Sequence, residues 1–317
     1  MKRIITFSRR TDGGLWIEFL VDKDRQGYCF APNPMTNKPY KVSLAPADVA
    51  LLTLWTKAPH LIVPHVAELS SRHELAFFVT VTGYAGSWLE PRVPGVEETI
   101  EGVRRLFGAL GKNPDRFFWR YDPIITTKQA FTAEWHAENF ATLCKQWKGM
   151  TKRVIVSNVQ VLGSYAAIEK KISAGARARG DAFVQLSYAA FVEVAARLRS
   201  IAAGHGIALQ VCCSPAIADA DQDAFGVANG ACLDPAALVA FDPAIARMEC
   251  AAAQRQGSAK LGYGPCLCSE ARDIGSKETC AHGCVYCYSN RSGGAIQLDI
   301  PPSSPWLSSK PFPGASS

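Results

Sequence analysis

The chain has 317 residues, 48% of them hydrophobic, and a formal net charge of +6 at pH 7, values that allow a sizeable core and an anionic substrate or nucleic acid as partner. No apolar run approaches the ~18–20 residues that a membrane span needs, and Arg9 and Arg10 end the apolar start of the chain too soon for a signal peptide. We therefore expect a cytoplasmic protein with no membrane partner.

Six runs of apolar, β-branched and aromatic residues predict strands. Their hydrophobicity is nearly continuous, which is typical of parallel strands that are buried on both faces. The runs span residues 3–8, 49–57, 75–83, 116–124, 152–159 and 207–213.

Periodic apolar residues predict helices between these strands, and Thr132 is the expected N-cap of one of them. The predicted helical stretches are 14–26, 63–72, 97–110, one that begins at Thr132, and 181–203. The basic, small-residue-rich segment 163–180 is predicted to form a loop or a partial helix.

Alternation of strands and helices predicts right-handed βαβ units and a parallel sheet. Polar residues follow nearly every predicted strand, and a β/α barrel builds its active site at that end of the strands. We therefore predict an α/β fold with a parallel (β/α) barrel-like sheet, a six-stranded partial TIM barrel, in one domain over residues 1–299. An open doubly wound sheet is the alternative. The Pro/Ser-rich segment 300–317 is predicted to be disordered.

Nine of the eleven cysteines lie between residues 212 and 287. In a reducing compartment such a cluster indicates metal binding more than disulfides. Cys280, Cys284 and Cys287 have the close spacing that can hold three irons of a [4Fe–4S] cluster, which leaves the fourth iron without a protein ligand. A zinc knuckle and a group of core cysteines are the alternatives.

The stretch 280–288 reads Cys-Ala-His-Gly-Cys-Val-Tyr-Cys-Tyr and resembles the CxxxCxΦC signature of the radical S-adenosylmethionine (SAM) superfamily, in particular that of the spore photoproduct lyases. The resemblance implies that the open iron binds SAM and that an electron from a flavodoxin- or ferredoxin-type donor yields a 5′-deoxyadenosyl radical. Two features depart from the superfamily. The motif follows the sixth predicted strand instead of the first, and no Gly-Gly-Glu follows the second.

Four further cysteines precede this motif and form a second predicted metal site. We expect them to ligate a second [4Fe–4S] cluster, and structural zinc is the main alternative because four thiolates satisfy it equally well. The four are Cys212, Cys232, Cys266 and Cys268. Cys213 and Cys250 are assigned to the core.

Charged and aromatic residues at the predicted strand ends complete the expected site. Arginine binds carboxylate or phosphate through two parallel hydrogen bonds, so Arg9 and Arg10 are predicted to bind the cofactor. Tyr286, the aromatic residue of the motif, is assigned to cofactor binding as well. Lys57 and Tyr84 are predicted to contact the substrate or to relay protons or hydrogen atoms.

Arg120 is predicted to bind an anionic substrate at the same site. Three arginines close together need anionic partners, because like charges repel and burial adds to the cost. Asp12 and Asp122 are expected to neutralise two of them and to leave roughly one positive charge for SAM or substrate. The alternative is an Arg–Asp network that only ties the strands together.

Motifs over most of the chain resemble a bacterial family known only as a domain of unknown function. They are Ser-Arg-Arg-Thr-Asp at 8–12, Asn-Pro-Met at 33–35, Trp-Thr-Lys at 55–57 with Pro59, Thr-Gly-Tyr at 82–84, Trp-Arg-Tyr-Asp-Pro at 119–123, and the cysteine-rich end. The resemblance implies that these stretches form one module, and it supplies no reaction. The chain departs from the family at Gly13-Gly14, where Ile-Pro is expected, and in the extended segment 163–180.

Together these patterns predict a radical-SAM-type enzyme that modifies or repairs a small-molecule or nucleotide-like anionic substrate. The alternative is a non-catalytic or redox iron–sulfur or zinc protein, with nucleic acid as its partner. SAM distinguishes the two hypotheses, because only the enzyme needs a cluster with an open iron.

Overall fold

The computed structural model of the chain describes residues 2–7, 10–33, 36, 38–212, 217–248, 266–290 and 300–307. Arg9, Cys213 and Cys250 lie outside the described residues, as does the stretch 308–317 of the tail. All seven cysteines of the two predicted metal sites lie within them.

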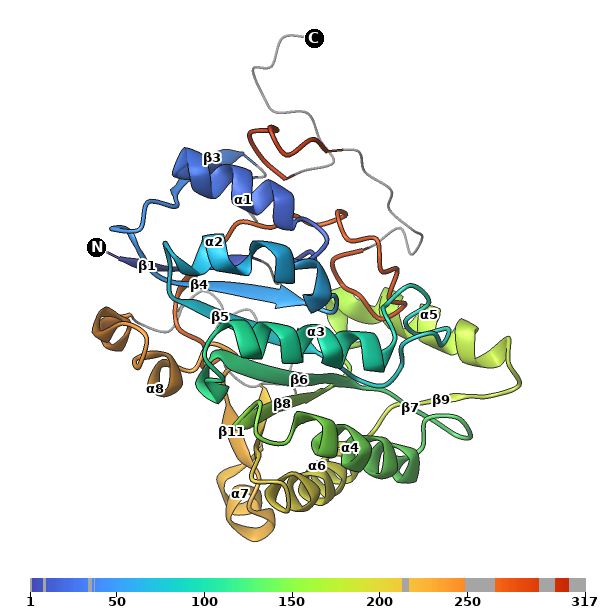
Figure 1. Cartoon of the computed structure of the whole chain (residues 1–317). Coiled ribbons are helices and arrows are strands. Elements are labelled where there is room, and N and C mark those ends of the chain that lie inside the picture. Colours follow the sequence, from blue (N-terminus) through green and yellow to red (C-terminus); the bar gives the residue numbers. More distant parts are fainter. Residues whose placement is uncertain are drawn as a thin grey trace.

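A parallel sheet runs through the middle of the molecule (Figure 1), with the strand order β11-β10-β8-β6-β5-β4-β1-β12. All neighbouring strands in it are parallel. The strands are β1 (Arg3–Phe7), β4 (Val49–Thr56), β5 (Leu75–Thr80), β6 (Phe117–Ile124), β8 (Arg153–Asn158), β10 (Ala208–Cys212), β11 (Ala228–Gly230) and β12 (Ala271–Asp273). The six predicted runs are all strands, and they lie side by side in chain order.

The α/β fold with a large parallel sheet is confirmed, and the strand number was wrong. The sheet has eight strands, because β11 and β12 extend it at its two edges. Each has three residues, too few to show the apolar run by which the other strands were predicted. Within the described residues β11 and β12 do not pair with each other, so closure into a barrel is not observed.

Helices cover one face of the sheet (Figure 1). They are α1 (Ile17–Gln26), α2 (Val66–Ser70), α3 (Val96–Ala109), α4 (Ala133–Trp147) and α6 (Tyr188–Ala203). Their apolar side chains pack on strand residues such as Phe77, Trp119 and Val154 in the larger core. Successive strand side chains point to opposite faces, so the residues next to these form a second core on the other face.

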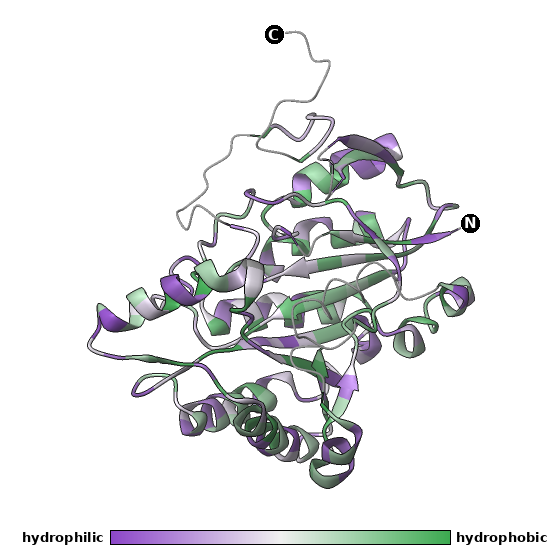
Figure 2. Cartoon of the chain, turned by 180° about the vertical axis from the view of Figure 1, so that it is seen from behind, coloured by the Kyte–Doolittle hydropathy of each residue, from purple (hydrophilic) through white to green (hydrophobic). Residues whose placement is uncertain are grey.

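Irregular chain that follows β11 covers this second face. Leu51, Phe78 and Phe118 of the sheet contact Leu233 and Ile245 there. Figure 2, which views the chain from behind, shows these strands as mainly hydrophobic. The described part of the covering segment, 231–248 and 266–270, contains the short helices α8 (Pro235–Leu238) and η5 (Pro243–Arg247) and no longer one.

Local hydrogen bonds set the helix starts. The Thr132 hydroxyl accepts a hydrogen bond from the Trp135 amide at 3.1 Å, which confirms the predicted N-cap. The helix predicted over 181–203 begins only at Tyr188, because Ser187 caps it and β9 (Phe183–Val184) pairs with β7 (Thr126–Thr127) before it. The segment 163–180 contains η4 (Gly163–Tyr165) and a full helix, α5 (Ala166–Arg177).

The remaining elements lie at the periphery. They are the hairpin of β2 (Tyr28–Pro32) and β3 (Pro39–Ser43), α7 (Asp219–Phe225), and the short turns η1 (Pro59–Leu61), η2 (Val63–His65) and η3 (Pro114–Arg116). In the tail, for which we expected disorder, Trp306 is buried beside Phe30, whose amide donates to the Pro305 carbonyl at 3.0 Å. No helix in the described ranges is long and apolar enough to cross a membrane.

Candidate functional site

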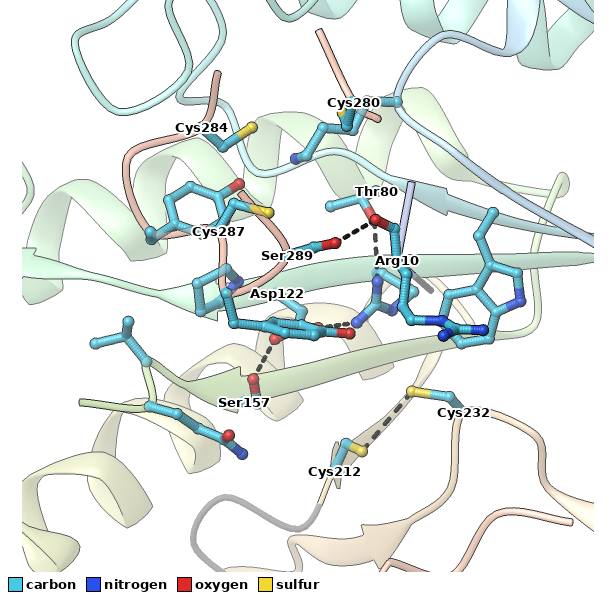
Figure 3. A pocket seen from close by; sticks show the side chains of 18 of the residues that line it. Arg10, Thr80, Asp122, Ser157, Cys212, Cys232, Cys280, Cys284, Cys287 and Ser289 are labelled. Atoms are coloured by element: carbon cyan, nitrogen blue, oxygen red, sulfur yellow. Dashed lines mark hydrogen bonds and ion pairs between the residues drawn. The ribbon is translucent and has the colours of Figure 1, made fainter. Parts of the chain in front are cut away.

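A cavity of ≈ 590 Å³ lies at the carboxyl ends of the strands (Figure 3). Its size is within the range of small-molecule pockets, about 300–1,000 Å³. Residues at or just after the carboxyl ends of β1, β4 and β6 line it, among them Arg10, Lys57 and Asp122. All seven cysteines of the two predicted metal sites line it as well: Cys212, Cys232, Cys266, Cys268, Cys280, Cys284 and Cys287.

The loop that carries Cys280, Cys284 and Cys287 comes from the end of the chain but lies beside the first strands. The Trp16 indole N–H donates to the Thr279 carbonyl at 2.8 Å. On the other side, the Val285 amide donates to the Leu89 carbonyl at 3.0 Å. These contacts hold the three thiols at the carboxyl end of the sheet.

Gly283 makes the tight turn of this loop possible. Its φ is +67°, a conformation that side chains other than glycine rarely adopt. A Cβ at this position would lie 2.3 Å from an Nη atom of Arg92, whose Nε donates to the Ala281 carbonyl at 2.9 Å. The arginine therefore fastens the loop, and an added Cβ would displace the end of its side chain.

Gly283→Ala should lower both stability and metal content. A residue with a Cβ in the left-handed region costs about 1–2 kcal/mol, and displacement of Arg92 adds to this. Gly180→Ala is a matched control, because Gly180 has a similar φ of +70° and nothing lies within 4 Å of the place that an added Cβ would occupy. Urea unfolding and iron analysis of both variants check this: equal effects of the two variants on iron content would contradict it.

Asp12 joins the loop to the first strands through a buried ion pair. Its carboxylate lies 2.9 Å from His282 Nε2 and accepts hydrogen bonds from the Thr56 hydroxyl at 2.7 Å and the Lys57 amide at 2.6 Å. Burial by itself would raise the pKa of Asp12, but the charge of His282 and these hydrogen bonds outweigh it and lower that pKa. Burial likewise would lower the pKa of His282, and Asp12 outweighs it and raises that pKa.

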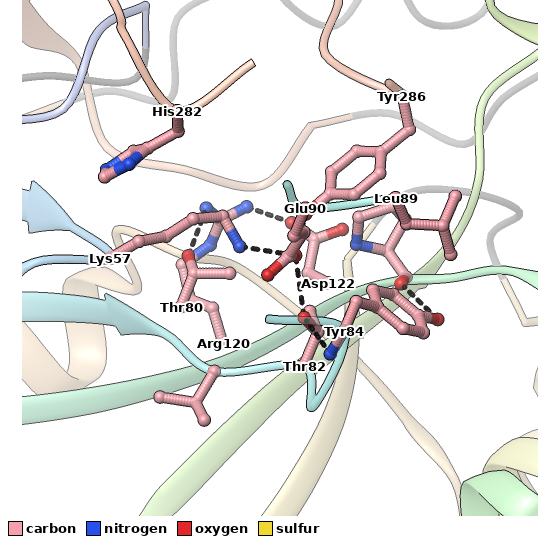
Figure 4. A network of polar contacts seen from close by, with 12 residues as sticks. Lys57, Thr80, Thr82, Tyr84, Leu89, Glu90, Arg120, Asp122, His282 and Tyr286 are labelled. Carbon is pink, nitrogen blue, oxygen red and sulfur yellow. Dashed lines mark hydrogen bonds and ion pairs between the residues drawn. The ribbon is translucent and has the colours of Figure 1, made fainter. Parts of the chain in front are cut away.

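Glu90 is the centre of a second polar network (Figure 4), which the sequence did not reveal. Its carboxylate is 1% exposed, lies 2.8 Å from the Lys57 ammonium, and accepts hydrogen bonds from Thr82 at 2.7 Å and from the Tyr286 hydroxyl. A single glutamate in a loop carries no motif, so only the fold identifies it. The network joins Lys57 to Tyr286 of the cysteine loop, and both are predicted site residues.

The two described arginines of the predicted site line the cavity, and each pairs with a carboxylate. Arg120 pairs with Asp122, as expected, and stacks over the Trp55 ring at 4.8 Å. Arg10 pairs with Asp273 at 3.1 Å, whereas Asp12 had been expected to neutralise one of the arginines. β12 brings Asp273 next to β1, and among the described residues Asp12 pairs with His282. Neutralisation of Arg9 by Asp12 stays a prediction, because Arg9 lies outside the described residues.

Tyr84, which we predicted to act on the substrate, is fully buried and is not among the residues that line the cavity. Its hydroxyl accepts a hydrogen bond from the Ile125 amide at 2.9 Å and donates to the Pro123 carbonyl at 3.2 Å. Nearby, His136 Nε2 lies 2.9 Å from the Ile125 carbonyl, and its Nδ1 lies 2.7 Å from the Tyr121 hydroxyl. A carbonyl only accepts, so Nε2 carries a proton, and burial, which lowers the pKa of His136 to about 4, favours the neutral imidazole.

The free energy of unfolding should fall between pH 6.5 and 4 because of His136. Burial lowers the pKa of His136 to about 4, whereas an unfolded histidine takes up a proton below about pH 6.5. The unfolded state therefore binds more protons in this window, and acidification favours it by up to about 3 kcal/mol. Urea unfolding across this range should show a shallower fall for His136→Gln than for the partly exposed control His65→Gln. Equal slopes would contradict the prediction.

The three thiols of the loop suit an iron–sulfur cluster in donor type and surroundings. Burial raises the pKa of Cys280, Cys284 and Cys287, and the positive charge of Lys57 opposes this at each of them. In the described ranges no group of three or more His, Cys, Asp or Glu side chains is already arranged to hold a single metal ion. A cubane cluster does not need that arrangement, since it binds each thiolate through a different iron.

The other four cysteines also line the cavity, and Cys212 and Cys232 lie at the opposite side from Cys280, Cys284 and Cys287 (Figure 3). The sulfur atoms of Cys212 and Cys232 are 3.7 Å apart. Cys268 shares hydrogen bonds with Cys232 and Cys266 and accepts one from the Leu233 amide at 3.4 Å. The structure thus brings together the second predicted ligand set as well as the first.

One family model matches residues 4–289, and its family is described as a domain of unknown function (DUF1848). This match agrees with the resemblance that the motifs indicated. No curated protein is similar enough to count as a match. One similar solved structure comes from work on inhibition of the pneumococcal virulence factor StrH and on N-glycan recognition and hydrolysis; identity is 12%, and the TM-score is 0.24 over 66% of this chain and 52% of that one. The chain spans about half of that protein, and so low a TM-score does not establish a shared fold.

Proposed function

Since the chain belongs to the DUF1848 family, for which no function is assigned, we propose from its own site that it is a radical-SAM-type iron–sulfur enzyme. Cys280, Cys284 and Cys287 would hold a [4Fe–4S] cluster that leaves one iron open to SAM. When bound, this group supplies reductive cleavage of SAM. The observation that supports the proposal is that these three thiols share one cavity with Lys57 and Arg120.

The residues around the cavity would bind and orient the reactants. Arg120 lies over the Trp55 ring and beside Asp122, so its guanidinium is held in place at the cavity wall. A guanidinium held in this way can share its donors between Asp122 and the carboxylate or phosphate of a ligand. This supports an anionic substrate, of small-molecule or nucleotide-like type.

Lys57 would serve the cluster more than the substrate. Its ammonium is held 2.8 Å from Glu90 and close enough to all three thiols to act on their charge. A cation beside three thiolates reduces the electrostatic cost of burying them. Tyr286 and Thr82 fix Glu90, so the network would keep the lysine at the cluster side of the cavity.

Anaerobic reconstitution of the full chain with iron and sulfide tests the proposal. The reduced protein should give the EPR signal of a [4Fe–4S] cluster, and addition of SAM should change that signal, because SAM binds the open iron. Dithionite and SAM together should yield 5′-deoxyadenosine and methionine. A cluster whose EPR signal is unchanged by SAM, with no cleavage products, would overturn the proposal in favour of a closed redox site.

A further inference from the structure

The second set of cysteines joins two parts of the chain that lie at opposite edges of the sheet. Cys212 ends β10 and Cys232 follows β11, at one edge. Cys266 and Cys268 precede β12, the strand at the other edge. All four nevertheless belong to, or pack against, the second core, on the face of the sheet opposite helices α1, α2, α3, α4 and α6.

The four thiols form an unbroken series of contacts. Cys212 lies 3.7 Å from Cys232, Cys232 hydrogen-bonds with Cys268, and Cys268 hydrogen-bonds with Cys266. The Leu233 amide donates to Cys268 Sγ at 3.4 Å. Such a group of soft sulfur donors, of which Cys232 and Cys268 are buried, is suited to a metal ion more than to a polar ligand.

The distance between Cys212 and Cys232 is that of a hydrogen bond between two thiols, and it is compatible with some occupants of the site and not with others. It is well above the ~2.05 Å of a disulfide bond. Two thiolates that share one tetrahedral zinc ion at ~2.3 Å stand about 3.8 Å apart, close to the 3.7 Å found here. A cubane cluster puts its thiolates on irons at different corners, so its sulfurs are much farther apart.

We propose that Cys212, Cys232, Cys266 and Cys268 bind one structural zinc ion. The ion would fasten the segment after β11 to the segment before β12. On that face of the sheet the described chain is irregular apart from short helices. Zinc tetrathiolates contribute folding energy directly in such places. Four thiolates and Zn²⁺ carry a net charge of about −2, and Arg120 lies close enough to Cys212 and Cys232 to offset part of it.

Zinc binding requires a rearrangement of the four thiols. No three possible ligands in the described part of the chain already surround one point, so the sulfur atoms must move closer together to share one ion. The site is separate from the proposed SAM cluster and does not depend on the proposed function.

The test uses the full chain, purified anaerobically and assayed for metals without reconstitution. We expect about one zinc per chain, with four sulfur neighbours at about 2.3 Å by X-ray absorption at the zinc edge. Titration with a mercurial that modifies thiols should release that zinc in the wild-type chain, which avoids variants that fail to fold. Cys266→Ser should lose the zinc and lower the thermal midpoint but keep its iron, whereas Cys284→Ser should lose iron and keep zinc. Cys144→Ala should change neither.

Three results would overturn the zinc site. The first is iron in place of zinc, at about twice the iron content of one cubane cluster. The second is a disulfide between Cys212 and Cys232 in a site without metal. The third is zinc that stays bound in Cys266→Ser with fewer than four sulfur neighbours. None of these results bears on the SAM cluster. They concern the other four cysteines, whereas cleavage of SAM depends on the iron that Cys280, Cys284 and Cys287 would hold.

Discussion

Replacing Cys280, Cys284 and Cys287 together by serine should remove about four irons per chain and abolish cleavage of SAM. A hydroxyl is a poor substitute for a thiolate as a ligand of iron, and the three side chains lie on one short loop at the cavity. Iron analysis and chromatographic detection of 5′-deoxyadenosine measure the two losses. Both losses are expected to be complete, because no other group in the proposal binds SAM to iron.

Cys144→Ala is the matched control for this triple variant. Cys144 is buried between α4 and the sheet, away from the cavity, so its removal takes away a thiol but no proposed ligand. Cleavage of SAM by the triple variant at the rate of the control would contradict the assignment of the cluster. Loss of iron from the control as well would show that iron content reports on folding and not on ligation.

Asp12→Ala should lower the free energy of unfolding by about 3–5 kcal/mol, the range for one partner removed from a buried ion pair. The substitution leaves His282 without its carboxylate, and it leaves the Thr56 hydroxyl and the Lys57 amide without their acceptor. Because His282 lies in the cysteine loop, iron content should fall together with stability. Urea unfolding and iron analysis of the same preparation measure both quantities.

Asp115→Ala provides the comparison for Asp12→Ala. Asp115 pairs with Lys152 at 2.8 Å, but about half of each side chain is exposed, so the loss should stay within about 1 kcal/mol. The pH dependence adds a second check. Since the pKa of Asp12 is lowered in the folded chain, its stabilisation is present above the usual aspartate pKa and is lost as the pH falls through the folded value. An Asp12→Ala variant no less stable than Asp115→Ala would show that the buried pair does not stabilise the fold.

Local sequence determined the main elements of the fold. The six predicted strands are present and adjacent in chain order, because long apolar runs can only be buried as central parallel strands. Thr132 caps its helix as predicted, since the cap depends on a hydrogen bond to a residue three positions away. The predicted strand ends also indicated where the cavity lies, because parallel strands place all their carboxyl ends at one edge of the sheet.

Contacts between distant parts of the chain could not be derived in this way. β11 and β12 have three residues each and are strands only because a neighbouring strand offers backbone partners. The pairing of Asp12 with His282 joins residues 270 positions apart, so no local pattern could assign His282 to that carboxylate in place of an arginine. Tyr84 follows a predicted strand, yet its side chain lies in the core and not at the cavity, because the turn after β5 directs it towards Ile125.

The sequence by itself determined which side chains are candidate metal ligands, because the spacing of Cys280, Cys284 and Cys287 and the thiol chemistry are properties of a short segment. Only the tertiary structure decided that both cysteine sets line one cavity, and that Cys212 and Cys232 lie 3.7 Å apart. It alone supplied Glu90 as the partner of Lys57. The physical reason is that ligand type is set by covalent chemistry, whereas distances between ligands depend on how the sheet brings remote segments together.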